Sequence, residues 1–206
     1  MVFVKQIKTG QLIQDLIITI IKVTKGYFLA IIIGLPLGTM MGISLKAYKY
    51  FSIIINMLRQ IPDLAWIPLL ILIFGLSQTS SIVIIAEASF FPIVLNSING
   101  LKSTPKEYIE VGKLYRINRV NMFMKVYLPS ALPSIFVGLR LGLSMAWSMV
   151  VVAEMIISST GIGQTINSAR NAMKSDILIF EMILIGITGS IMDFLLRKLS
   201  NYFIKM

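Results

Sequence analysis

Five apolar segments, each long enough to cross a bilayer, follow one another along the chain. They cover residues 12–45, 51–76, 81–98, 131–157 and 177–196. Lys22 and Lys25 interrupt the first segment, which leaves its continuous part at 26–45. A helix of about 20 residues crosses a hydrocarbon core of roughly 30 Å. The pattern therefore predicts an all-α integral membrane protein with about five transmembrane helices.

Composition supports this fold class and limits the chemistry. Of the 206 residues, 56% are hydrophobic and 14% are charged, whereas a soluble domain has about a quarter of its residues charged. Soluble enzymes and secreted scaffolds are therefore excluded. The chain contains no Cys and no His, which excludes disulfides, thiolate nucleophiles and imidazole metal sites.

Positive charge predicts the orientation in the membrane. The net charge of +10 is attributed to cytoplasmic loops beside membrane lipid, and not to nucleic acid. The interval 100–130 has six Lys or Arg against Glu107 and Glu110, so we expect it to be cytoplasmic. Five spans then place the C-terminus in the cytoplasm and the N-terminus outside. Lys5, Lys8, Lys22 and Lys25 conflict with an outer N-terminus, which leaves two alternatives: an amphipathic segment on the outer leaflet, or a further N-terminal span that this chain lacks.

Small residues recur every four positions in two of the apolar segments. They are Gly26, Ala30, Gly34, Gly38 and Gly42 in the first segment, and Gly138, Gly142 and Ala146 in the fourth. Residues at this spacing share one helical face, and small side chains there let two helix backbones approach closely. We predict tight helix packing along both faces.

One cytoplasmic interval has a recognisable spacing. Glu110-Val111-Gly112 is followed by three residues, Arg116, nine residues, Val126, one residue and Leu128-Pro129. This resembles the EAA loop of the membrane subunits of type 1 ABC importers, whose pattern is Glu-Ala-Ala, three residues, Gly, nine residues, Ile, one residue, Leu-Pro. The resemblance implies the type 1 ABC importer permease fold, with two short cytoplasmic helices that dock on an ATPase subunit. It implies ATPase-coupling roles for Glu107, Glu110, Gly112, Arg116, Leu128 and Pro129.

Residue chemistry is compatible with a docking helix in this loop. Pro105 can begin a helix, and Glu107 and Glu110 lie near the positive N-terminal end of that helix. The alternative is a solvated basic loop that serves only topology. Arg116 stands where the family pattern has Gly, which would allow a positive φ between the two helices. Either Asn118 makes the turn instead, or docking is altered.

The resemblance extends from about Thr19 over nearly the whole chain. The segments that show it are Arg59-Gln60-Ile61-Pro62, Ile67-Pro68-Leu69, Phe90-Phe91-Pro92-Ile93, Gly138-Leu139-Arg140-Leu141-Gly142, Val152-Ala153-Glu154-Met155 and Gly161-Ile162-Gly163. They are most similar to importers of nitrate, sulfonates and taurine, and vitamin-precursor importers look similar too. The implied division is an N-terminal segment at 1–11, a permease domain at 12–200 with its coupling loop at about 101–130, and a cytoplasmic tail at 201–206.

The same resemblance implies partners and a location. They are an ABC ATPase that binds ATP and Mg, an extracytoplasmic solute-binding protein, and a second permease copy that would make a homodimer in the plasma membrane. The chain itself has no G-x-x-x-x-G-K-[ST] phosphate loop, so we expect it not to be an enzyme and to hold no cofactor.

Charged residues inside spans are candidates for the translocation path, because an unpaired charge there is costly. Glu87 and Glu154 are two such residues, with a buried ion pair to Arg59 or Arg140 as the alternative. Arg59 and Arg140 are the other two, with snorkelling to the cytoplasmic interface as their alternative. An ATPase-independent carrier or channel that uses Glu87 and Glu154 is the competing function.

Backbone features add two weaker hypotheses. Pro62, Pro68 and Pro92 interrupt helical hydrogen bonding, as hinges or as static kinks. Gly161-Ile162-Gly163 would permit close approach of another backbone, such as that of a solute-binding protein.

Overall fold

The computed structural model describes residues 11–204, and its secondary structure there is helical. In chain order the helices are α2 (Gln11–Ile43), α3 (Leu45–Leu58), the 3-10 helix η1 (Asp63–Ala65), α4 (Trp66–Phe74), α5 (Gln78–Lys102), α6 (Lys106–Leu114), α7 (Arg119–Met122), the π-helical turn η2 (Phe123–Tyr127), α8 (Leu128–Ile156), α9 (Ile162–Asn171) and α10 (Ser175–Ile204). The predicted all-α class is confirmed.

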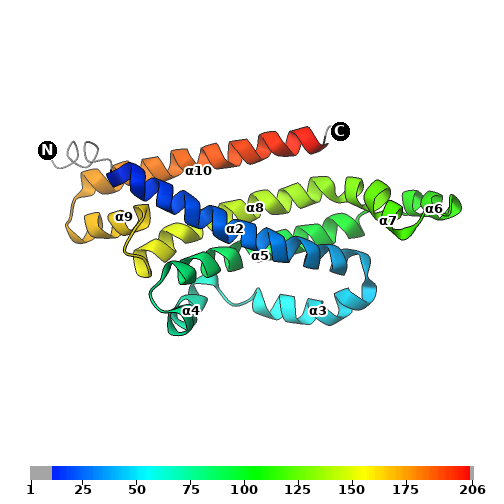
Figure 1. Ribbon diagram of the computed structural model, residues 1–206, viewed down its shortest axis with the longest axis horizontal. Coiled ribbons are helices and arrows are strands. Elements are labelled where there is room, and N and C mark those ends of the chain that lie inside the picture. The colour runs from blue at the N-terminus through cyan, green and yellow to red at the C-terminus, as the bar shows by residue number, and fades with distance from the viewer. Residues whose placement is uncertain (1–10, 205–206) are drawn as a thin grey trace.

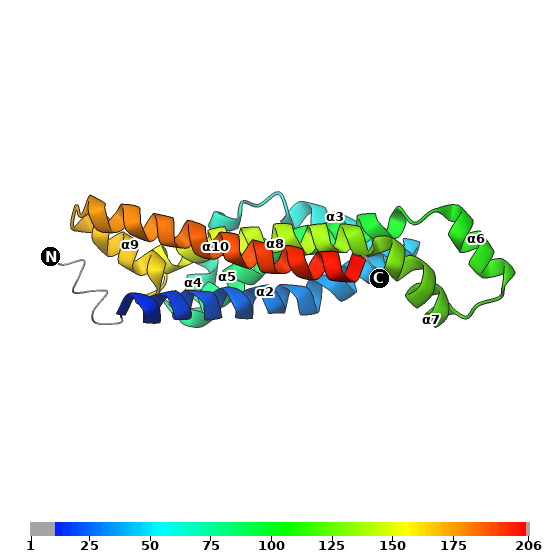
Figure 2. The same ribbon diagram turned by 90° about the horizontal axis from the view of Figure 1, so that it is seen from above.

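The long helices form an elongated bundle around α5 and α8 (Figures 1 and 2). Helix α2 packs mainly on α5, and α10 packs on α8 and α9. Helices α6 and α7 extend beyond one end of the bundle, while α9 and the start of α10 lie at the other (Figure 2). The start of α2 and the interval 154–176 therefore share one end, as the predicted topology requires.

Within residues 11–204, four helices are long and apolar enough to span a membrane, and a bent pair makes a fifth crossing if it is counted as one. That pair, α3 and α4, corrects the second predicted span, because the two parts are bent by 78° at the interval between them. Pro62 lies in this interval with an extended ψ of 136°, and a helix rarely continues into a proline. Pro68 lies in the first turn of α4, where its missing N–H costs nothing. Helix α5 continues through Pro92.

Two predicted boundaries also change. Helix α2 runs through Lys22 and Lys25 without interruption, and the buried contacts of Lys22 account for this. At the other end of the chain, α10 continues to Ile204, into the predicted tail. Residues 1–10 of the predicted N-terminal segment, with Lys5 and Lys8, lie outside the described residues.

The small-residue faces pack where they were expected to. A Cβ at Gly38 would lie 2.7 Å from Ser97 Cβ and 2.8 Å from the Val94 carbonyl oxygen on α5. On the side of α5 that faces α8, a Cβ at Gly138 would lie 2.6 Å from Asn96 Cβ. Helix α5 thus contacts both α2 and α8 at backbone distance, which confirms the predicted tight packing.

Candidate coupling loop and intramembrane charges

Helix α6 ends in a tight hydrogen-bonded turn that fixes the direction of the loop. The Arg116 N–H donates to the Lys113 carbonyl (2.9 Å) and the Ile117 N–H donates to the Gly112 carbonyl (3.2 Å). This pair of bonds is the Schellman motif of helix C-termini, whose C′ residue needs a left-handed conformation. Arg116 occupies that position with φ of +49°. Arg116 itself therefore makes the turn for which the family pattern has Gly.

Asn118 has a different role from the one considered for it. Its backbone is extended, with φ of −68° and ψ of 164°, and it caps α7 by accepting the Asn121 N–H on Oδ1 at 2.8 Å. The alternative in which Asn118 makes the turn is therefore wrong. The physical reason is that α6 still needs its last carbonyls satisfied, and the Schellman bonds satisfy them at Arg116 and Ile117.

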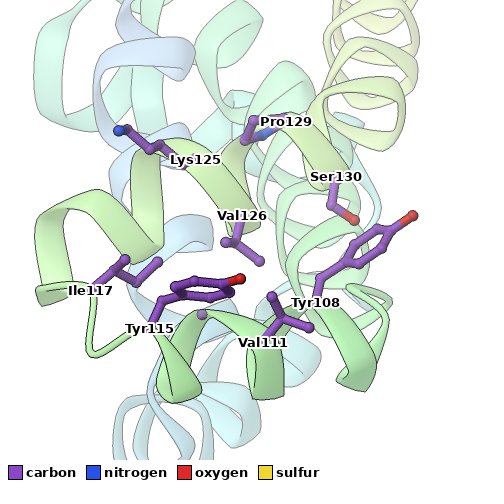
Figure 3. A pocket seen from close by; sticks show the side chains of 9 residues that line it. Tyr108, Val111, Tyr115, Ile117, Lys125, Val126, Pro129 and Ser130 are labelled. Carbon is purple, nitrogen blue, oxygen red and sulfur yellow. The ribbon is translucent and has the colours of Figure 1, made fainter.

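A groove of about 740 Å³ lies between α6 and the start of α8. Figure 3 shows Tyr108 and Val111 from α6, and Tyr115 directly after it, on one side of the groove, with Val126, Pro129 and Ser130 on the other. Tyr115 is 77% exposed and Leu114 is 80% exposed. This apolar surface belongs to the part of the molecule that projects beyond the bundle, so it is suited to cover by another protein.

The predicted coupling residues occupy distinct places in the loop. Glu107 and Glu110 are exposed on α6, and no ion pair to either is found among residues 11–204. Gly112 is buried, with Met122 Sδ 2.8 Å from the position of an added Cβ. Leu128 packs into a small core with Leu101 and Ala131, while Pro129 lines the groove. The acids are thus free to meet a partner.

Glu154 lies in a buried network at the opposite end of the bundle. Its Oε1 accepts a hydrogen bond from Lys22 Nζ at 2.9 Å, and the exposed fractions of the two side chains are 0% and 2%. Its Oε2 accepts the Gly163 N–H at 3.0 Å, and the Thr19 hydroxyl lies at 2.9 Å from the same oxygen. The ion-pair partner of Glu154 is therefore Lys22, and not Arg59 or Arg140 as considered from the sequence.

The same network organises the Gly161-Ile162-Gly163 segment. The Thr19 hydroxyl accepts the Ile162 N–H at 3.0 Å, and Asp15 accepts the Gly161 N–H at 3.1 Å. Gly161 has φ of +107°, and a Cβ there would collide with the Glu154 carboxylate. The backbone that closely approaches Gly163 is the Val151 carbonyl of the chain itself, whereas Gly161 is approached by the Glu154 side chain. The network joins α2, α8 and the N-terminus of α9, where a carboxylate is favourable.

Arg140 and Arg59 differ in their surroundings. Arg140 pairs with Asp193 of α10, with Nε 3.1 Å from Oδ1, and Arg197 binds the other carboxylate oxygen at 2.5 Å. Arg59 follows the 14 residues of α3, so it lies about 20 Å along the helix axis from its start. Because α3 begins at Leu45 and not at residue 51, Arg59 lies farther along the span than the predicted bounds placed it.

Glu87 lies in the middle of α5. Both of its carboxylate oxygens are buried, and within residues 11–204 they have no hydrogen-bond partner. The ion pair considered for Glu87 is therefore not formed with Arg59 or Arg140. A role for Glu87, Glu154, Arg59 or Arg140 in translocation stays a prediction.

Comparison with known proteins gives the family. Residues 13–203 match the family described as binding-protein-dependent transport system inner membrane component. The chain is a member of this family. It is an ABC importer permease subunit of the sulfonate, nitrate and taurine branch.

Similar proteins cover nearly the whole chain. A protein named as an ABC transporter permease in Methanocaldococcus jannaschii is 40% identical over 95% of this chain and 74% of its own length. The aliphatic sulfonates transport permease SsuC of Bacillus subtilis is 34% identical over 98% of this chain and 74% of its own. The taurine permease TauC of Escherichia coli is 32% identical over 91% and 68%.

A solved structure confirms the permease fold. An inward-facing MetNI methionine ABC transporter is similar with a TM-score of 0.81 and 20% identity, covering 94% of this chain and 96% of the compared chain. At that identity the likeness concerns the fold alone.

Sequence reasoning missed three residues that the structure brings to the candidate charges. They are Lys22 beside Glu154, Asp193 beside Arg140, and Asp63 in the same cavity as Arg59. One signal was available for the first: Thr19 and Lys22 are three residues apart, so they share a helical face within an apolar segment.

Proposed function

We propose that this permease subunit imports a small anionic solute across the plasma membrane, driven by a separate ABC ATPase that docks on the α6–α8 loop. The observation that carries the coupling part is the groove beside α6. Exposed Tyr108, Val111 and Tyr115 line it beyond the end of the bundle, and an apolar surface of this kind is suited to a protein partner.

Two charged residues fit the same role. Glu107 lies in the first turn of α6 and Glu110 one turn later, both exposed and free of ion pairs within the described chain. Carboxylates on the rim of an apolar docking surface orient a partner more than they add affinity. ATP and Mg would be bound by that ATPase.

The names of the relatives support the solute class. SsuC and TauC are named for aliphatic sulfonates and taurine, and further relatives are named for nitrate and bicarbonate import. Each of these solutes has an anionic group with several oxygens. An extracytoplasmic binding protein would deliver the solute, and a second copy of the permease would complete the path as a homodimer with its C-termini in the cytoplasm.

Charge reversal at Glu110 tests the coupling. The complex purified from its native membrane with its ATPase would be reconstituted in liposomes, and ATP-driven uptake of taurine, ethanesulfonate and nitrate would be measured. We expect Glu110→Lys to lower uptake of the transported anion at least tenfold and to weaken ATPase retention. Asp176→Lys is the matched control, because Asp176 is exposed at the opposite end of the bundle and the charge change is the same.

Undiminished ATP-driven uptake by Glu110→Lys would contradict the coupling role. Uptake driven by an ion gradient in vesicles that contain this chain alone would instead favour an ATPase-independent carrier. Glu87 would then be the first residue to replace, because its carboxylate oxygens are buried without a partner in the described chain.

A further inference from the structure

We propose that the break between α3 and α4 forms an anion-binding site on the translocation path, where the Arg59 guanidinium holds the oxyanion head group of the solute. The proposal rests on the importer function and adds to it a residue, a place and a ligand chemistry: a small monovalent oxyanion such as a sulfonate, nitrate or bicarbonate.

A cavity of about 320 Å³ lies at this break. Its lining includes Arg59, Asp63, Ala88, Asn96, Leu141 and Met145. Ala88 and Asn96 lie on either side of the middle of α5, and Leu141 and Met145 lie near the middle of α8. The cavity is therefore halfway along the bundle. Its volume is at the lower end of the range of about 300–1,000 Å³ that small ligands occupy.

The backbone of the break requires water or a polar neighbour. The carbonyls of Arg59, Gln60 and Ile61 accept no backbone or side-chain hydrogen bond from residues 11–204. Those three residues are exposed. Unpaired backbone at membrane depth is tolerated only where it is buried in protein or lines a water-filled cavity. A path beside the break satisfies this condition.

Pro92 adds a further acceptor on the opposite wall. Because it has no N–H, it leaves the Ala88 carbonyl without its usual helical partner. The Asn96 side-chain N–H₂ group is bound to the Pro92 carbonyl at 2.9 Å, which leaves its amide oxygen directed elsewhere. The wall of the cavity thus presents polar groups where a buried apolar helix surface would present none.

Arg59 is the group that sets the ligand chemistry. Lys22 is paired with Glu154, and Arg140 and Arg197 share Asp193. Arg59 is exposed at the cavity, and within the described part of the chain it has no ion pair or side-chain hydrogen bond. A guanidinium presents a planar fork of donors that matches an oxyanion.

Asp63 makes the site a weak one. It lines the same cavity, and a carboxylate there lowers the affinity for any anion, and for a dianion most. Passage through a path requires that a solute bind well enough to enter and weakly enough to leave. Asp63 therefore tunes release, and its removal strengthens anion attraction.

Cysteine labelling tests the site without depending on transport. The chain has no native Cys, so Met145→Cys places one thiol on the cavity wall, at a side chain that is 46% exposed. The full chain in lipid nanodiscs would be reacted with an anionic sulfonate-bearing methanethiosulfonate, a cationic one and a small neutral one. We expect the neutral reagent to react and the anionic reagent to be favoured over the cationic one.

Further substitutions in the Met145→Cys protein identify the residues that cause the preference for the anionic reagent. We expect Arg59→Gln to lower the ratio of anionic to cationic labelling rates at least fivefold, and Asp63→Asn to raise it. Lys25→Gln is the matched control: it removes the same charge from an exposed position on α2 and leaves the ratio unchanged. An unreactive thiol, or a ratio that Arg59→Gln does not change, would overturn the proposal.

Uptake separates this proposal from the importer function. In the reconstituted complex, Arg59→Gln should lower anion uptake at least tenfold while ATPase turnover continues, and Arg59→Lys should retain part of the uptake. If labelling is charge-selective but no ATP-driven uptake is found, the importer function is refuted and the anion site is retained. Normal uptake by Arg59→Gln would refute the site alone.

Discussion

Removing one member of the Lys22–Glu154 pair tests how the end of the bundle near α9 is held together. Both side chains are almost completely buried, with Nζ 2.9 Å from Oε1. Removing one partner of such a pair leaves an uncompensated buried charge, which costs about 3–5 kcal/mol. For a chain of this size, about 1 kcal/mol lowers Tm by roughly 2–4 °C, so Lys22→Met should lower Tm by roughly 6–20 °C.

The double variant Lys22→Met/Glu154→Gln distinguishes the ion pair from simple loss of packing. It has no buried charge left, and the new amide keeps an acceptor for the Gly163 N–H. Replacing both members of a buried pair is often close to neutral. We therefore expect the double variant to recover most of the stability that either single variant loses, with a coupling energy of about 2–3 kcal/mol. Lys25→Met is the control, because Lys25 is exposed on the same helix.

The assay is thermal unfolding, in one detergent, of the wild type, Lys22→Met, Glu154→Gln, the double variant and Lys25→Met, together with hydrogen exchange of the α9 amides. Gly163 N–H donates to Glu154 Oε2 at 3.0 Å, so exchange at the start of α9 should accelerate in the single variants. Additive losses of Tm in the double variant would refute the reasoning, as would a loss in Lys25→Met equal to that in Lys22→Met.

Three further predictions use thermal unfolding as well. Gly161→Ala should lower the free energy of unfolding by at least about 2–3 kcal/mol, because the φ of Gly161 is +107° and an added Cβ would collide with Glu154. Its control is Gly186→Ala, where the added Cβ meets nothing within 4 Å, so the free energy of unfolding should stay unchanged or rise by up to about 1 kcal/mol. Gly38→Ala should cost about 1–3 kcal/mol, since its Cβ would lie 2.8 Å from the Val94 carbonyl oxygen, whereas Gly34→Ala, at 3.3 Å from Phe90, should be tolerated. Arg116→Gly should raise the free energy of unfolding by about 0.5–1 kcal/mol, because glycine adopts the left-handed conformation without strain, and Arg116→Ala should leave it unchanged. A lower free energy of unfolding in Arg116→Gly would contradict the assigned turn.

Hydropathy and spacing predicted the class of fold because both depend on local sequence. A run of apolar residues must be a helix at membrane depth, since only internal hydrogen bonding satisfies its backbone there. The glycine repeat likewise predicted which face of α2 packs closely, since every fourth residue shares a face. The fixed spacing from Glu110 to Pro129 located the loop that projects from the bundle.

The partners of the charged residues could not be predicted in the same way. Lys22 and Glu154 are 132 positions apart, and which base meets which acid depends on how α2 crosses α8. Lys22 was therefore taken as an interruption of a span, although its buried partner is what permits the span to continue. The bend after Leu58 had a local signal in Pro62, but its size depends on how α4 packs on α5.

Helix α8 connects the two ends of the molecule. Together with α7 and η2 it forms one continuous helical segment, Arg119–Ile156, of 38 residues, which is about 57 Å long at 1.5 Å per residue. It begins in the loop beside α6 and ends next to the Glu154 network. A displacement of the loop must therefore tilt α8 as a rod or be absorbed where its hydrogen bonding changes, at the π-helical turn η2.

Along most of α8, close packing on α5 determines which of these two responses is possible. At Gly138 and Gly142, added Cβ atoms would lie 2.9 Å from the Pro92 carbonyl oxygen and 3.1 Å from the Ser89 carbonyl oxygen on α5. Two backbones in such contact cannot slide or tilt independently, because packed interiors have no free volume to take up the movement. A tilt of α8 must therefore carry α5 with it, and the walls of the Arg59 cavity, which come from α5 and α8, move as one body against the break between α3 and α4.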